Sequence, residues 1–329
     1  DPYDDYVGCD VNRGLGYYYN GDNYDGDNSG YKGYGYSPPA VGVDFFEGPY
    51  QDNDNIDNAF GIGDNEALNG IGYGDGVVDN ERFGMRRFLY YSNTTNGANP
   101  NQTDPTNASD YYNYLRGFWK DGSKFVYGGS GHISDPEADP NTPCEFMFPG
   151  NTDPLGWGTN GVPQPVWTEQ TANNTPNDRR FVESAGPFVL KPGSVNNITV
   201  GVVWARTTSG GASGSLNLLK LASDKAQTLF NNNFKILDGP NAPDIEIQEL
   251  EQELVMKFLN TNSGKIENYV EKYRDATNKL RTYKFEGYLV YQLKDGTVST
   301  SDLDNVDKAR LLFQCDLKNN RGMIVNKVY

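Results

Sequence analysis

The sequence has little of the chemistry on which most enzymes depend. His132 is the only histidine, so no metal centre built from two or three imidazoles can form. No HExxH motif occurs, and a single histidine argues against a serine or cysteine protease triad. We expect His132, which follows Gly-Gly-Ser-Gly, to be a loop residue rather than a base. The sequence therefore predicts a protein that is not an enzyme.

Cysteine is also scarce. The three cysteines, Cys9, Cys144 and Cys315, lie far apart and form no CxxC motif, so a zinc site is not expected. Two interpretations fit equally well. Either Cys9 and Cys144 form a disulfide within a first domain, or all three are buried free thiols.

Long hydrophobic runs and positive charge are missing as well. No run of about 18 apolar residues occurs, so no transmembrane segment is expected. The formal net charge is −16, with 44 acidic and 28 basic residues. Such an acidic chain is a poor partner for nucleic acid or for an anionic membrane surface.

Glycine, tyrosine and short acidic segments are abundant. The 38 glycines and 23 tyrosines indicate many turns and short strands, and therefore a mainly β fold. In the tyrosine–glycine segment 31–36, we favour tyrosines that pack across a sheet. The alternative is a carbohydrate platform.

The acidic segment 69–81 resembles the middle of an EF-hand or dockerin-type calcium loop. Its candidate ligands are the side chains of Asn69, Asp75, Asp79 and Glu81 and the carbonyl of Val77. It lacks the carboxylates at the first, third and last positions of a standard EF-hand, so we predict a non-standard Ca²⁺ site. The alternative is a set of glycine turns with solvated carboxylates.

Two further segments place three carboxylates close together. One contains Asp22, Asp25 and Asp27, and the other is residues 52–58. Their charges repel one another unless water or a cation screens them, which makes both segments secondary candidates for Ca²⁺.

The order of elements predicts two domains, 1–238 and 239–329, separated by the Gly/Pro-rich segment 238–243. The first is a loop-rich β-sandwich domain with acidic loops and one packed helix. The expected elements are strands at 6–10, 15–20, 40–46 and 82–91, a helix opened near 109–110, and a helix over 216–231 capped by Ser215.

The second half of this domain contains an expected hairpin and a long segment without periodicity. Residues 179–190 and 198–205 are expected to form a hairpin through a Pro-Gly turn, and the apolar run 198–205 to lie deep in the core. Residues 121–180, which lack periodicity, are expected to have a function or to wrap a core.

The second domain is predicted to be a fibronectin-III-like β-sandwich. Strands are expected at 245–247, 253–259, 281–293, 309–316 and 323–328. A complete sandwich uses about seven strands, so we expect the domain to be truncated.

Several segments carry a family resemblance. Tyr6-Val-Gly-Cys-Asp10, Leu15-Gly-Tyr, Ser184-Ala-Gly-Pro-Phe-Val-Leu-Lys-Pro-Gly193 and Tyr283-Lys-Phe-Glu-Gly-Tyr-Leu-Val-Tyr291 resemble segments of large secreted proteins of Bacteroidota. Such proteins are similar to cargo of the type IX secretion system. The resemblance implies export to the cell surface and a fibronectin-III-like module, and it carries no catalytic residues.

Together these features predict a secreted, calcium-stabilised structural or adhesive module of a larger surface protein or assembly. The expected partners are other surface proteins or further copies of the chain, and glycans. The alternative is a carbohydrate-binding or glycoside-hydrolysing surface protein, for which Asp135, Glu137 and Asp139 beside Trp157 and Trp167 are the candidate site.

Overall fold

The computed structural model describes residues 3–28, 30–93 and 98–318. Its contacts divide the chain into two compact units, Asp1–Ala226 and Gln227–Tyr329. The division falls inside a helix, earlier than the segment 238–243 at which the sequence predicts a boundary. The protein is mainly β, as expected.

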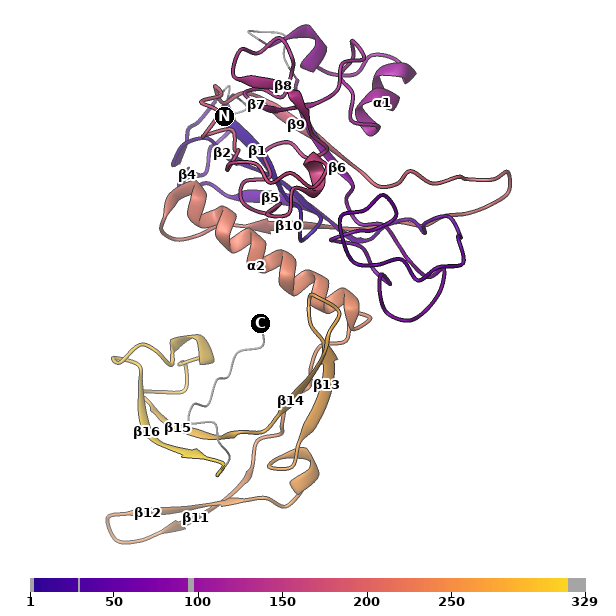
Figure 1. Cartoon of the computed structure of the whole chain (residues 1–329). Helices are drawn as coiled ribbons and strands as arrows, with labels where there is room; N and C mark the ends of the chain where they lie inside the picture. The colour runs from indigo at the N-terminus through magenta and orange to yellow at the C-terminus, as the bar shows by residue number, and fades with distance from the viewer. Residues whose placement is uncertain (1–2, 29, 94–97, 319–329) are drawn as a thin grey trace. The chain divides into compact units, whose positions relative to one another are not determined.

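A four-stranded antiparallel sheet in the order β1-β2-β5-β10 forms the centre of the first unit (Figure 1). Its strands are β1 (Asp5–Asp10), β2 (Leu15–Asn20), β5 (Ala40–Glu47) and β10 (Thr199–Ala205). The sequence locates all four, because each is a short apolar or aromatic run bounded by glycine or turn residues. Smaller pairs are β3 (Tyr24–Asp25) with β4 (Gly35–Tyr36), and β7 (Val126–Gly128) with β8 (Ala138–Pro143).

Helix α2 (Gly211–Asn231) covers one face of this sheet. Leu219 is fully buried there, and a Cβ on Gly42 would lie 2.8 Å from Leu15 Cδ1 and 3.3 Å from Leu219 Cδ2. Glycine at position 42 therefore allows the helix to pack closely. The predicted cap Ser215 lies inside the helix instead, and its Oγ accepts a hydrogen bond from the Thr207 N–H (3.1 Å).

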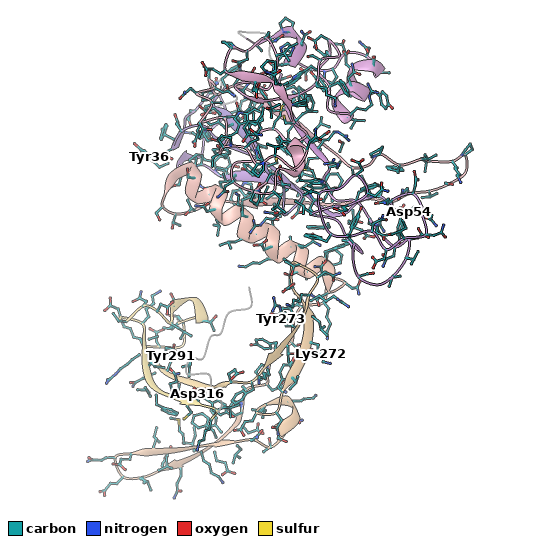
Figure 2. The ribbon with its side chains drawn as sticks, viewed as in Figure 1. Tyr36, Asp54, Lys272, Tyr273, Tyr291 and Asp316 are labelled. Carbon is teal, nitrogen blue, oxygen red and sulfur yellow. The ribbon has the colours of Figure 1, made fainter. Side chains whose placement is uncertain are left out.

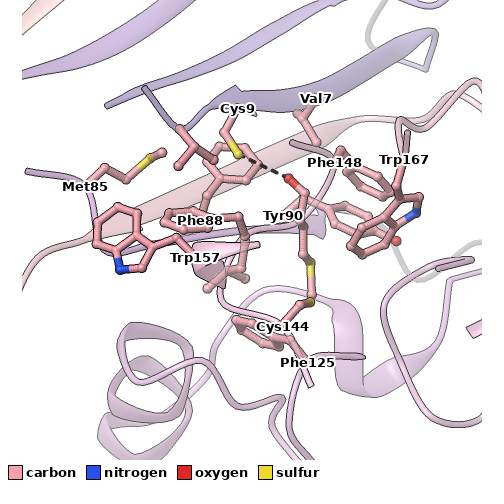
Figure 3. Close-up of a cluster of buried hydrophobic side chains, with 14 of the residues drawn as sticks. Val7, Cys9, Met85, Phe88, Tyr90, Phe125, Cys144, Phe148, Trp157 and Trp167 are labelled. Carbon is pink, nitrogen blue, oxygen red and sulfur yellow. Dashed lines mark hydrogen bonds between the residues drawn. The ribbon is translucent and has the colours of Figure 1, made fainter. Parts of the chain in front are cut away.

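On its β1 side, the other face of the sheet is covered by a second sheet and by the long excursion. Strands β6 (Arg87–Ser92) and β9 (Arg179–Ser184) pair antiparallel. Helix α1 (Ala108–Leu115) precedes the excursion and is capped by Asn107, not by Ser109 or Asp110. The expectation that residues 121–180 wrap a core is confirmed. They supply five aromatic side chains of the main cluster, namely Phe125, Phe146, Phe148, Trp157 and Trp167, most of which are labelled in Figure 3.

The cysteines form no disulfide. Cys9, Cys144 and Cys315 are all free thiols. Cys9 is buried in the main cluster, where its Sγ donates to the Met147 carbonyl (3.4 Å; Figure 3). The predicted Cys9–Cys144 bond is therefore wrong, and so is the burial of all three, because Cys315 is exposed.

The predicted hairpin of residues 179–190 and 198–205 is also wrong. Strand β9 pairs with β6, whereas β10 pairs with β5 at the edge of the four-stranded sheet. Strand β10 is consequently not deep in the core. Val203 and Ala205 face α2, but the alternate side chains Val202 and Trp204 are exposed.

The second unit contains three antiparallel hairpins, none of which pairs with another within the described residues. They are β11 (Asp244–Glu249) with β12 (Leu254–Leu259), β13 (Val270–Arg274) with β14 (Leu280–Lys284), and β15 (Gly287–Leu293) with β16 (Ala309–Asp316). The predicted strand 281–293 is two strands of different hairpins, and β13 was not predicted. The predicted strand 323–328 lies outside the described residues.

Two acidic side chains are buried between the sheet and α2. Asp10 pairs with Arg13 (Nη1 to Oδ2, 2.8 Å), and Arg13 also contacts Asp224 of α2 (Nε to Oδ1, 2.9 Å). Among the described residues, Asp44 has one hydrogen-bond donor, the hydroxyl of Ser223 (2.5 Å), and none of them donates to its Oδ1. Burial raises the pKa of Asp44 to about 7.

We expect the substitution Asp44→Asn to reduce the pH dependence of stability. In the unfolded chain the Asp44 pKa is about 3.9, so between about pH 4 and pH 7 the folded protein holds a proton that the unfolded chain has released. The contribution of Asp44 to the free energy of unfolding should therefore fall as pH rises, by up to about 1.4 kcal/mol per pH unit in that window.

Urea denaturation of the parent, D44N and the exposed control D64N across this pH range measures the difference. The slope should flatten only in D44N, which should also be the more stable protein above pH 7. Equal slopes in all three proteins would contradict the interpretation.

Candidate functional site

Two of the three acidic segments identified in the sequence lie against each other. The N–H of Gly74 donates to the carbonyl of Asn58 (2.7 Å), and the N–H of Asp79 donates to the carbonyl of Ile56 (3.4 Å). We call residues 52–58 and 69–81 together the acidic double loop. Figure 2 shows Asp54 of this double loop and Tyr36 on opposite sides of the first unit.

Carboxylates hold the two halves of the double loop together. Asp79 Oδ1 accepts hydrogen bonds from the N–H groups of Asp54 (2.8 Å) and Asn55 (2.9 Å). Asp57 Oδ2 accepts from the Gly76 N–H (2.7 Å). The buried Glu81 accepts through Oε1 from the Asn58 N–H (2.6 Å). These acids therefore fix backbone geometry as well as contributing charge.

The other predicted ligands have different surroundings. Asp75 accepts the Val77 N–H at 2.9 Å, and Val77 itself is exposed. Asn69 donates from Nδ2 to the carbonyls of Val11 and Met85, both at 2.8 Å, and so braces the base of the loop against the core. The structure therefore brings Asp79, Glu81 and the segment 52–58 together, and turns the Asn69 amide group away toward the core.

The double loop needs its glycines. Gly72, Gly74 and Gly76 have φ values of 85°, 64° and 89°, a region in which side chains with a Cβ are strained. Asp79 shares that region at φ 56°. Aspartate tolerates it better than most residues, because its side chain bonds to nearby backbone.

The segment with Asp22, Asp25 and Asp27 is built from similar turns. Asp22 accepts the Tyr24 N–H (2.7 Å), Asp25 the Tyr34 N–H (2.9 Å) and Asp27 the Gly33 N–H (3.0 Å). Across residues 3–28, 30–93 and 98–318, no group of three or more His, Cys, Asp or Glu side chains is placed to hold a metal ion. Within the double loop, however, Asp57 Oδ1 is buried and receives no hydrogen bond from any described residue, as a ligand oxygen would. Calcium binding stays a prediction.

His132 belongs to a cluster that the sequence does not reveal. Its buried ring lies between two polar partners, with Nε2 3.0 Å from Asp121 Oδ2 and Nδ1 2.7 Å from Ser134 Oγ. Nδ1 also accepts the Ser134 N–H (3.1 Å), so the tautomer that fits carries its proton on Nε2. Since Nε2 contacts Asp121 and Nδ1 contacts Ser134, the ring cross-links the two ends of the loop 121–134. His132 is a loop residue as expected, but a buried one.

The carboxylates proposed for glycoside hydrolysis are not arranged as an acid pair beside exposed rings. Trp157 and Trp167 are buried in the main cluster. Asp135 accepts the N–H groups of Ser130 (2.7 Å) and Glu137 (3.0 Å). Desolvation raises the pKa of Asp135, but the hydrogen bonds lower it by more, so the pKa lies below its usual value. A general acid needs a raised pKa.

The tyrosines fall into two groups. Tyr17 and Tyr19 are buried under α2. Tyr36 does pack on Tyr24 across the β3–β4 pair, with ring centroids 4.9 Å apart, but both rings remain exposed, and so does Tyr34. Cross-strand packing of the segment is therefore confirmed for Tyr36 only, and without burial.

Comparison with known proteins gives no relative: no protein-family model, curated protein or solved structure matches the chain. Within the described part of the chain, no helix has the length and apolar character needed to span a bilayer.

Replacing Asp79 should loosen the double loop. The substitution Asp79→Ala removes the two hydrogen bonds that the Asp79 carboxylate accepts from Asp54 and Asn55. It also leaves a residue less suited to φ 56°, so we expect the free energy of unfolding to fall by about 2–3 kcal/mol. Asp79→Asn keeps an acceptor oxygen and tolerates this backbone region, so its loss should be smaller.

The measurement is urea denaturation in the presence of EDTA, which separates this effect from any bound cation. Asp75→Ala, which loses only hydrogen bonds within residues 75–80, is the matched control. Equal losses for the Asp79→Ala and Asp75→Ala variants would show that the interloop bonds contribute little.

Proposed function

We propose that this chain is a non-enzymatic structural or adhesive module of a larger extracellular assembly, and that calcium stiffens its first unit. The observation that carries the proposal is the two-faced character of the β11–β12 hairpin. Ile245 lies opposite Phe258 and Ile247 opposite Met256, so these apolar side chains share one face. Ile247 is 62% exposed, although it lies mid-strand in an apolar row.

The opposite face of the hairpin is polar in its centre, where Glu246 pairs with Lys257 (3.3 Å). Isolated two-stranded hairpins have little stability in water, and exposed apolar faces commonly mark contact surfaces. Since one face is polar and the other apolar, the hairpin is suited to pack against further protein.

The inner end of this apolar face already packs in that way. The ring of Phe258 lies 6.0 Å from that of Tyr288 and 6.2 Å from that of Phe313, which belong to β15 and β16. Two hairpins that meet through aromatic side chains resemble the two layers of a β-sandwich. This contact supports a fibronectin-III-like arrangement that additional strands complete, and the sequence resemblance supports its export to the cell surface.

Self-association through this face is directly testable. We expect the full chain to associate reversibly in sedimentation velocity and to bind ANS, a dye that reports exposed apolar surface. The double variant Ile247→Lys/Met256→Lys should remain monomeric and bind less dye, because charges replace the apolar pair. Substituting the polar face, Glu246→Lys/Lys257→Glu, keeps the ion pair and should associate normally. A parent chain that is monomeric at all concentrations and binds no ANS would refute the proposal.

Calcium stabilisation has its own test. We expect Ca²⁺ to raise the melting temperature of the first unit and EDTA to reverse the rise, with Mg²⁺ much less effective because it requires a smaller, rigid octahedral site. Asp57→Asn, which removes the charge of the partner-free Oδ1, should reduce the response, whereas the exposed control D64N should not. A melting temperature that is the same in Ca²⁺ and in EDTA would exclude a stabilising site.

A further inference from the structure

The face of the four-stranded sheet that points away from α2 is only half covered. On its β1 side, Val7 and Cys9 are buried in the main cluster beneath β6 and β9. On its β10 side, Val202 is 74% and Trp204 53% exposed. A buried core strand would not leave such side chains in water, so this half of the face is available for contact.

The exposed aromatic side chains form a row across the strands. Tyr18 of β2 lies opposite Val41 of β5, and Val41 lies opposite Trp204 of β10. Tyr18 is 39% exposed. Strands are spaced about 4.8 Å apart, so Tyr18 and Trp204 are separated by about 10 Å, with Val41 as the floor between them.

A third aromatic ring is fixed beside this row. The guanidinium of Arg206, two residues after Trp204, lies 5.4 Å from the ring centre of Tyr34. It also donates to the carbonyls of Tyr34 (2.6 Å) and Ser37 (3.0 Å). Tyr34 lies close enough to Tyr18 that its charge adds to the burial and to Asp5 in raising the Tyr18 pKa. The ring of Tyr34 is thus held in place without being buried.

We propose that Tyr18, Trp204 and Tyr34 form a platform for a neutral polysaccharide. The C–H face of a pyranose ring is apolar and stacks on an aromatic ring, while tyrosine hydroxyls offer hydrogen bonds to the sugar hydroxyls. The spacing of Tyr18 and Trp204 is close to the length of two linked pyranose rings. The net charge of −16 disfavours acidic polysaccharides.

The position of the tyrosines favours a glycan over a protein strand. A strand that extended the sheet would run along the free edge of β10 and use its backbone groups. Tyr18 lies two strands inside that edge, and Tyr34 lies in a separate loop. A ligand that contacts all three rings must cross the strands, which a polysaccharide chain does and an added strand does not.

Trp204 provides a selective probe, because Trp119, Trp157 and Trp167 are all buried. We expect soluble β-glucan, mannan or xylan to retard the protein in affinity gel electrophoresis and to protect its fluorescence from acrylamide quenching. Alginate, which is anionic, should do neither. Trp204→Ala and Tyr18→Ala should each weaken binding about tenfold, the effect typical of removing one stacking ring. Tyr111→Ala removes an exposed ring on α1 and is the matched control.

The inference is overturned if none of the three neutral polysaccharides retards the protein, or if Trp204→Ala leaves the retardation unchanged. It is also overturned if sedimentation shows an oligomer that Trp204→Ala dissociates, since the face would then be a protein contact. These outcomes are independent of the Ile247→Lys/Met256→Lys experiment, which concerns the second unit, so the glycan platform and the assembly function can fail separately.

Discussion

The ion pair between Glu169 and Arg179 joins the two sheets of the first unit. Glu169 is fully buried; its Oε1 accepts the N–H of Val7 in β1 (2.9 Å), and its Oε2 accepts from Arg179 Nη2 (2.8 Å). Arg179 begins β9, donates to Ser92 Oγ of β6 (2.8 Å) and lies 5.0 Å from the ring centre of Tyr90. A buried charge is tolerated only when such partners are in place, so this pair fixes three strands relative to one another.

The same pair explains why a long segment without periodicity folds against a core. Burial raises the pKa of Glu169, and the charge of Arg179 opposes that rise. Glu169 lies near the end of the excursion, after Trp157 and Trp167 have entered the main cluster. The excursion is therefore anchored by its aromatic side chains and then closed by one carboxylate. Irregular backbone can be as firmly held as a strand when its side chains provide the contacts.

The sequence pattern predicted individual strands correctly where one continuous run of residues forms one strand. Short apolar and aromatic runs bounded by glycine and turn residues identified β1, β2 and β5 at 6–10, 15–20 and 40–46. It failed at 281–293, where one continuous apolar pattern spans a break between β14 and β15. The pairing of β9 and β10 with strands far away in sequence was also beyond reach, because a Pro-Gly turn indicates only that the chain turns there.

In the candidate sites, too, the residue types can be read from the sequence, whereas the contacts between distant segments cannot. Residue types drew attention to the acidic segments, but the bonds of Asp79 to Asp54 and Asn55 join positions 25 and 24 residues apart. No spacing rule links two irregular loops. The sequence does not reveal the cluster around His132, because a lone histidine forms no motif and its partner Asp121 lies 11 residues away in the chain.

The exposed face of β10 follows from how α2 packs. Gly42, Val203 and Ala205 leave room for α2 to lie close over β5 and β10. In a strand the alternate positions point the other way, so the large side chains of the run 198–205 are directed outward. The run 198–205 therefore directs Val203 and Ala205 toward the helix and Val200, Val202 and Trp204 toward solvent. Total hydrophobicity suggested a core strand, although a strand at the edge of a sheet can leave one of its two apolar faces exposed.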